Sequence, residues 1–172
     1  MKLSFFSLAS GSSGNCYYLG TPDFGILIDA GISFRTIKKV LKDNNIDISK
    51  IAAVLVTHDH ADHIKTVGYL GEKMYLPIYS TADVHRGIDN SRYVEETLNG
   101  SRRIIQKEVP FMIRDFSIVA FEVPHDSTDN VGYHICYKEH KFTFATDVGH
   151  ITDTVKKYMS MANHLIIEAN YD

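Results

Sequence analysis

The pattern of apolar residues divides the chain into many short strands and a few amphipathic helices. Strands are expected at residues 3–9, 15–19, 25–29, 51–57, 77–80, 104–109, 111–114, 117–123, 131–137, 141–146 and 164–168. Helices are expected at residues 33–44, 61–73 and 152–161, and one more after Thr81. The polar segment 90–100 fits either a helix or a flap. This mixture of strands and helices predicts a mixed α/β class.

Length and composition indicate one ordinary globular domain covering residues 1–172. The chain is 44% hydrophobic and 23% charged, which suits a soluble protein with a real core. The net charge of −3 provides no overall basic field to attract nucleic acid. Local basic groups at 35–42, 102–103 and 156–157 are interpreted as solvated faces of helices or strands.

Two cysteines and a short apolar start bear on the compartment. Cys16 and Cys136 lie far apart without a Cys-x-x-Cys motif, so both are expected to be reduced thiols in a cytoplasmic protein. The brief apolar stretch at residues 3–9 contains two serines and favours a first strand over a signal peptide. No stretch is long and apolar enough for a membrane span, so no membrane association is expected.

A histidine-rich motif, Thr-His-Asp-His-Ala-Asp-His, occupies residues 57–63 directly after the apolar run 51–57. Imidazole and carboxylate are the ligands that Zn²⁺ binds. In extended backbone His58 and His60 point to the same side, whereas the adjacent Asp62 and His63 diverge. The spacing therefore predicts two metals side by side, with one pair of residues on each. The alternative is a solvated polar loop.

The motif Thr-His-x-His-x-Asp-His after an apolar strand resembles the signature of the metallo-β-lactamase superfamily. Further strings at residues 10–15 (SGSSGN), 28–31 (IDAG), 145–147 (ATD) and 168–172 (EANYD) are similar to its YycJ/WalJ-like branch of bacterial hydrolases related to nucleases. The resemblance implies a four-layer αββα sandwich of two mixed sheets with helices outside. It also implies that the C-terminal part of that fold is missing.

Strand ends supply further candidate ligands. His58, His125 and Asp147 each follow an expected strand, so they meet at one rim if those strands share an orientation. His125 would complete a three-histidine site with His58 and His60. Asp147 would bridge both ions and join Asp62 and His63 on the second, as the resemblance also implies. The alternatives are a loop histidine for His125 and a helix N-terminal acid for Asp147.

The resemblance assigns supporting roles outside the ligand set. Asp29 corresponds to an aspartate that orients the metal loop by hydrogen bonds, and a turn cap is the alternative. Asp62 and Asp147 are expected to be the catalytic carboxylates beside a hydroxide shared by two divalent ions, Zn²⁺ or Mn²⁺, about 3.5–4 Å apart. His150 is a candidate proton donor.

One departure from the superfamily pattern concerns the second ion. Members continue to a further histidine that completes this site, whereas here only His150 and His164 follow Asp147, outside the expected motif. The second ion is therefore expected to bind weakly. An uncovered sheet edge after Glu168 would also allow homo-oligomers to form.

The expected function is that of a metal-dependent hydrolase, as a phosphodiesterase or nuclease acting on DNA or RNA. This substrate class comes from the resemblance. The enzymatic alternative is hydrolysis of a thioester or other small ester, as in glyoxalase II. A metal-stabilised binding module without activity is the third alternative. A basic extended groove would indicate a nuclease, and a small closed pocket an ester hydrolase.

Overall fold

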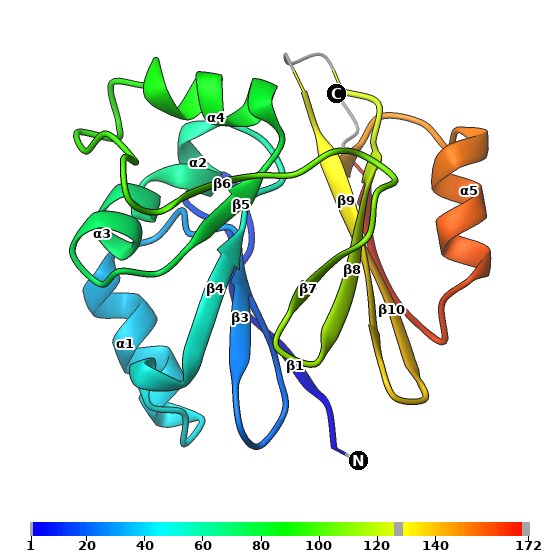
Figure 1. The fold of residues 1–172 in the computed structure, drawn as a ribbon, viewed down its shortest axis with the longest axis horizontal. Coiled ribbons are helices and arrows are strands. Elements are labelled where there is room, and N and C mark those ends of the chain that lie inside the picture. The colour runs from blue at the N-terminus through cyan, green and yellow to red at the C-terminus, as the bar shows by residue number, and fades with distance from the viewer. Residues whose placement is uncertain (1, 126–128, 170–172) are drawn as a thin grey trace.

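Two β-sheets lie face to face, and helices cover the outer surface of each (Figure 1). The computed structural model describes residues 2–125 and 129–169. Asn170, Tyr171 and Asp172 of the C-terminal string therefore lie outside the described residues. The expected four-layer sandwich of two mixed sheets is confirmed, and it brings together segments that are far apart in the sequence.

The first sheet has six strands: β1 (Ser4–Ala9), β2 (Cys16–Gly20), β3 (Gly25–Ile28), β4 (Ile51–Leu55), β5 (Ile78–Ser80) and β6 (Arg102–Ile104). They lie in sequence order, antiparallel from β1 to β3 and parallel from β3 to β6. The outer helices are α1 (Phe34–Asp43), α2 (Ala61–Ile64), α3 (Val67–Glu72) and α4 (Ala82–Asp89), and a 3₁₀ turn covers Ile48–Lys50.

The second sheet has five strands: β7 (Phe111–Ile113), β8 (Phe116–Glu122), β9 (Val131–Tyr137), β10 (His140–Val148) and β11 (His164–Ala169). Their order is β11-β10-β9-β8-β7, and only the β10–β11 pair is parallel among the described strands. Helix α5 (Asp153–Ser160) covers the outer face of this sheet (Figure 1).

The period-2 alternation of strands divides the apolar residues between two cores. In β2, Tyr17 and Leu19 face the space between the sheets, while Cys16 and Tyr18 face the helices outside the first sheet. Tyr17 and Tyr133 are among the largest fully buried side chains, so the inter-sheet core is aromatic. All of β2 is buried, as expected for a strand covered on both faces.

Tertiary contacts changed several expected boundaries. The helix expected at 61–73 is two helices, α2 and α3, because the intervening Thr66 bonds elsewhere. Its backbone N–H donates to the Ala30 carbonyl at 2.9 Å and its hydroxyl donates to the Ile32 carbonyl at 2.5 Å. The strand expected at 104–109 is β6, shifted toward the N-terminus, and segment 90–100 forms turns.

Two smaller expectations can also be compared with the structure. Cys16 and Cys136 are free thiols, the first buried and the second half-buried. Within the described ranges, no helix is long and apolar enough to cross a membrane.

Candidate metal centre

The candidate ligands lie where strands of both sheets end. The apolar strand β4 stops at Leu55, and the buried residues Val56 and Thr57 lead directly into His58. On the facing sheet, β8 stops at Glu122 and the chain reaches His125 three residues later. A hydrogen bond of 2.9 Å from the Val131 N–H to the Thr57 carbonyl joins the two sheets beside the histidines.

Four histidine rings gather at this junction. The ring centroids of His58 and His63 are 4.0 Å apart, and those of His58 and His60 are 4.5 Å apart. The His125 ring lies 5.4 Å from His58 and 5.1 Å from His60. His58 and His63 are buried, whereas His60 is exposed and His125 is half-buried. The structure thus brings together all four histidines proposed from the sequence.

Two carboxylates complete the cluster. Asp147 Oδ2 lies 3.2 Å from His58 Nε2 and 3.3 Å from His63 Nε2. Asp62 Oδ2 lies 3.6 Å from His63 Nε2. One potential ligand atom from each of His58, His63 and Asp147 lies within 4.8 Å of the other two, a grouping that could hold a metal ion. Zn²⁺ binds just such mixtures of imidazole and carboxylate.

The backbone around the motif differs from the extended chain assumed in the sequence analysis. His60 is still extended, with φ −68° and ψ 144°, but helix α2 begins at the next residue. Asp62 and His63 therefore lie on a helix, where adjacent side chains are about 100° apart instead of opposed. Their polar atoms approach each other instead of diverging, so the geometry does not separate the ligands into two independent pairs.

The buried Asp29 side chain forms hydrogen bonds to two residues of the histidine motif. Its Oδ1 accepts a hydrogen bond of 2.8 Å from the Thr57 N–H, and its Oδ2 accepts one of 2.7 Å from the Thr57 hydroxyl. Its Oδ2 also lies 2.7 Å from His63 Nδ1. Because a carboxylate only accepts, His63 Nδ1 carries the proton and Nε2 faces the cluster. Asp29 thus has the contacts expected of a residue that orients a metal-binding loop.

The same logic fixes the ring of His58. The Thr57 hydroxyl donates its proton to Asp29, so it accepts from His58 Nδ1, which lies 2.9 Å away. His58 Nε2 is then the unprotonated nitrogen. It is buried and has no hydrogen-bond partner among the described residues, since the nearby Asp147 carboxylate can only accept. A nitrogen lone pair without a hydrogen-bond partner in a buried cluster suits a divalent cation.

Burial and neighbouring charges shift the pKa values of residues in the cluster in opposite directions. Burial, together with the neighbouring His63 and His60, lowers the pKa of His58 to about 2, so this ring stays neutral. Burial also lowers the pKa of His63, but the charge of Asp29 and hydrogen bonds to Asp147 and Asp29 outweigh it and raise the pKa to about 10. Without a cation this ring therefore carries a proton on Nε2 as well as on Nδ1, and the Nε2 proton would have to leave before that nitrogen could bind a metal. The hydrogen bond from His63 lowers the pKa of Asp147, which therefore stays ionised.

A residue that the sequence analysis did not name individually supports Asp62. The side-chain amide of Asn15 lies 3.1 Å from Asp62 Oδ2 and 3.2 Å from His63 Nε2. Its backbone N–H donates to the Asp62 carbonyl at 2.7 Å. The loop at 10–15 thus lies with its backbone against the metal motif. The only signal for Asn15 in the sequence is its position as the last polar residue before a buried strand.

Asp29 and Asp147 share an unusual backbone conformation. Their φ angles are +61° and +54°, in the left-handed region that non-glycine residues rarely adopt. Asp147 lies within β10, where the pairing with β11 is irregular between Ala145 and Val148. The sequence analysis had placed it just beyond the strand. The irregularity turns its carboxylate toward the histidines instead of along the sheet.

His150 is not joined to the cluster by any contact that the described part of the chain shows. Its side chain is exposed, two residues beyond the end of β10. Its role as a proton donor therefore stays a prediction.

Two mixed sheets packed face to face, with histidines and aspartates gathered at one edge between them, define the metallo-β-lactamase class of fold. The chain belongs to the beta-lactamase superfamily, whose domain family it matches over residues 25–172. The solved structure of a B3 metallo-β-lactamase with an active-site glutamic acid superposes with a TM-score of 0.71. That match is 14% identical and covers 95% of this chain and 74% of the other, so it establishes the fold alone.

Bacterial nucleases are similar in sequence over nearly the whole chain. Exodeoxyribonuclease WalJ of Streptococcus pneumoniae is 33% identical over 165 residues, covering 96% of this chain and 61% of WalJ. Exodeoxyribonuclease YycJ of Bacillus anthracis is 31% identical over 172 residues, covering 100% of this chain and 64% of YycJ. The chain thus spans somewhat less than two thirds of the length of these relatives.

Proposed function

We propose that this chain is a metal-dependent hydrolase that cleaves phosphodiester bonds in nucleic acid, as an exodeoxyribonuclease. The observation that carries the proposal is the gathering of His58, His63 and Asp147, with an orphaned His58 Nε2, at one edge of the sandwich. The names of the similar proteins WalJ and YycJ supply the substrate class, DNA.

The proposed centre holds two divalent ions, Zn²⁺ or Mn²⁺. His58, His60 and His125 would bind the first through imidazole nitrogen, Asp62 and His63 would bind the second, and Asp147 would bind both. The mutual approach of the four rings supports this set. Asp147 supports it as well, because one of its oxygens lies 3.2–3.3 Å from both His58 and His63.

When bound, such cations acidify water toward neutrality and offset the negative charge that builds up on a phosphodiester in the transition state. The chain's own part is to hold the ligands ready. Asp29 and Thr57 keep the protons of His63 and His58 on Nδ1 and turn Nε2 toward the cluster. Asn15 donates a hydrogen bond to the Asp62 carboxylate and so orients this proposed ligand as well.

An open hollow beside the motif favours a polymer over a small ester. It has a volume of about 610 Å³ and is lined by motif residues Asp59 and Ala61 and, on or after α4, by Arg86, Asn90 and Tyr93, among others. Tyr93 is 50% exposed and the Arg92 guanidinium lies over its ring, 5.2 Å from the centroid, so an aromatic ring and a cation lie together beside the hollow, as nucleic acid contacts require. A small closed pocket would instead have favoured the thioester or ester substrate.

The proposal is tested by hydrolysis of bis-p-nitrophenyl phosphate and of a 5′-phosphorylated single-stranded DNA in Mn²⁺ or Zn²⁺. Cleavage of both is expected, with stepwise shortening of the DNA from one end. Asp62→Asn and Asp147→Asn should each lower the rate by at least a hundredfold. Asp23→Asn, in an exposed turn, is the matched control and should leave the rate unchanged.

Turnover of lactoylglutathione without cleavage of any nucleic acid would replace the nuclease proposal with the thioester alternative. Metal binding without turnover of any of these substrates would favour a binding module. His150→Gln separates a proton donor from a bystander, because loss of a donor lowers kcat while metal affinity stays the same.

A further inference from the structure

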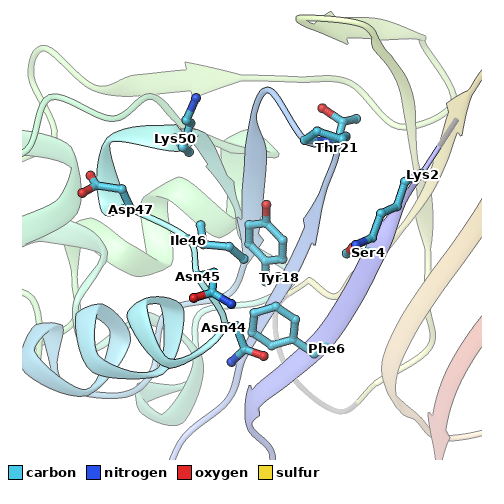
Figure 2. Close-up of a pocket in the computed structure, with 11 residues that line it drawn as sticks. Lys2, Ser4, Phe6, Tyr18, Thr21, Asn44, Asn45, Ile46, Asp47 and Lys50 are labelled. Carbon is cyan, nitrogen blue, oxygen red and sulfur yellow. The ribbon is translucent and has the colours of Figure 1, made fainter.

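Another hollow lies at the opposite end of strand β4 from the metal cluster. It has a volume of about 550 Å³, within the usual range for small-molecule sites. Its lining includes Lys50, which directly precedes β4, whereas His58 follows that strand. Figure 2 shows Phe6 and Tyr18 on the sheet with the segment 44–47 facing them. This hollow is called the distal pocket below.

The floor of the distal pocket is built around Tyr18. The Phe6 and Tyr18 rings stack with centroids 5.0 Å apart. The phenol lies over Gly20 and Gly25, where an added Cβ would fall 2.0 Å and 2.5 Å from its oxygen. Two glycines paired across neighbouring strands therefore leave the room that this ring occupies.

The hydroxyl of Tyr18 opens into the distal pocket and forms no hydrogen bond with any described residue. The residue as a whole is only 3% exposed, and the pocket is where its phenol oxygen can reach a partner outside the protein. Tyr133, by comparison, donates its phenol to the Val56 carbonyl at 2.6 Å. A hydroxyl at the floor of a cavity, with no protein partner, can donate to or accept from a polar ligand that replaces its water.

Charges at the rim define that ligand further. Lys2 and Lys50 are exposed on either side of the aromatic pair (Figure 2) and can pair with an anion. Asp47 is the one carboxylate among the lining residues, and its backbone hydrogen bond from Ser49 lowers its pKa, so it stays ionised. It can accept a hydrogen bond from an amino group, and it repels a second anion.

A basic face adjoins the distal pocket. A neighbouring hollow, distinct from the distal pocket, is lined by Lys38, Lys39 and Lys42 of α1. It shares residues 45–47 with the distal pocket. Arg35 and these three lysines recur at helical spacing along α1, which begins after Ser33 and ends beside the pocket at Asn44. This basic group, expected from the sequence to be a solvated face, therefore borders a hollow that adjoins the distal pocket.

We propose that the distal pocket binds a nucleotide, with a planar base carrying an amino group against Phe6 and its phosphate at Lys2 or Lys50. The phenol of Tyr18 would hydrogen-bond the base, and Asp47 would accept from the amino group. This inference rests on the proposed action on nucleic acid. The nucleotide is either a free monophosphate, such as exonuclease action releases, or one unit of a bound strand that follows the basic face of α1.

Backbone amide chemical shifts of the Zn²⁺-loaded protein test this proposal directly, because they locate binding. Deoxyadenosine 5′-monophosphate should shift the amides of Tyr18, Gly20 and Gly25 at concentrations where inorganic phosphate does not. Tyr18→Phe should weaken this binding about fivefold, the usual cost of one hydrogen bond. Lys50→Met should weaken it and reduce its salt dependence. The matched controls Tyr75→Phe and Lys73→Met, at exposed positions elsewhere, should bind like the unaltered chain.

A 5′-phosphorylated oligo-deoxyadenylate separates the two sources of the nucleotide. Binding at least tenfold tighter than the monophosphate, lost with Lys38→Met and Lys42→Met, indicates a strand, whereas equal affinity indicates the free nucleotide. Absence of shifts at Tyr18, Gly20 and Gly25, or unchanged binding in both pocket variants, overturns the proposal. Cleavage of bis-p-nitrophenyl phosphate is measured separately, so failure of the distal pocket and failure of the nuclease proposal are distinguishable.

Discussion

At the residue scale, Asp29 is not a proposed metal ligand, but it forms several hydrogen bonds to residues of the histidine motif. It accepts from Thr57 twice and from His63 once, and it is fully buried. Its φ of +61° is tolerated by asparagine at least as well as by aspartate, so Asp29→Asn changes charge and acceptor number without changing backbone shape.

We expect Asp29→Asn to lower metal affinity by about 10- to 100-fold, the usual effect of losing the outer partner of a metal-binding histidine. Competition with a chromophoric chelator measures this affinity, and circular dichroism checks the fold. Asp23→Asn serves again as the exposed control. Unchanged affinity in Asp29→Asn would show that Asp29 only caps the turn after β3, which is the alternative role considered from the sequence.

Gly31 gives a steric test of the same loop. A Cβ at Gly31 would fall 1.7 Å from the Asp62 carbonyl oxygen, which is backbone and cannot move aside cheaply. Gly31→Ala should therefore lower the free energy of unfolding by about 1–3 kcal/mol and weaken metal binding as Asp62 shifts. Chemical denaturation and chelator competition are the measurements.

Gly100 is the matched control for this substitution. A Cβ there meets no atom within 4 Å, so Gly100→Ala should change stability by less than about 0.5 kcal/mol. Equal effects at Gly31 and Gly100 would mean that the loop can accommodate a side chain.

Much of the candidate site could be predicted at this scale. His58, His60, Asp62 and His63 follow from one motif, and the structure places them together with His125 and Asp147. Asn15 and the proton positions on the rings could not be predicted. They depend on hydrogen bonds between residues 47 or 34 positions apart, which no local pattern contains.

At the element scale, a partly buried hydrogen bond joins β11 to the other sheet. The phenol of Tyr17 in β2 lies 3.1 Å from both carboxylate oxygens of Glu168 in β11. Burial, with the charge of Glu168, raises the pKa of Tyr17, so the phenol stays protonated and donates. This contact fixes the edge strand of the second sheet close to the metal cluster.

We expect Tyr17→Phe to lower the free energy of unfolding by about 1–2 kcal/mol, since a hydrogen bond to a charged group is lost. Amide exchange in β11 should accelerate more than exchange in β9. Tyr137→Phe is the matched control, because its phenol lies in the same core without a hydrogen bond to any described residue. Equal losses in the two variants would assign the effect to packing instead of the hydrogen bond.

Element types were predictable where the apolar period was strong, and boundaries failed where tertiary bonds intervened. Ser33 and Thr81 cap α1 and α4 as their sequence context suggested. The break between α2 and α3 was missed because Thr66 bonds to Ala30 and Ile32, on a different segment. The extension of β10 through Asp147 was not predicted, because the identity of a residue as aspartate does not reveal that its φ angle is positive.

At the scale of the whole molecule, the sandwich of two mixed sheets followed from the family resemblance and not from the apolar pattern, and neither predicted the order of strands within each sheet. Periodicity separates strands from helices, but it does not say which strands pair. Contacts such as Tyr133 Oη to the Val56 carbonyl, at 2.6 Å, fix how the sheets face each other. They join residues 77 positions apart and exist only once the sandwich has formed.

The proposed ligands come from both sheets, so a bound cation should stabilise the whole sandwich. His58 and His63 follow β4 of the first sheet, while His125 and Asp147 belong to the second. Metal at a hundred times its Kd adds about 2.7 kcal/mol to the free energy of unfolding. For a domain of this size, that corresponds to a rise in Tm of about 5–10 °C. His125→Ala should abolish most of this rise while leaving the Tm in chelator unchanged.

Calorimetric titration of the chelated protein with Zn²⁺ should then show one tight event and one weaker event. Three histidines suffice for the first ion, whereas the second has Asp62, His63 and a share of Asp147. His60→Ala should weaken the tight event and Asp62→Asn the weaker one, and His164→Gln, at an exposed position outside the cluster, should affect neither. Two equally tight events would mean that a further residue completes the second site, and His150→Gln would then identify or exclude His150 as that ligand.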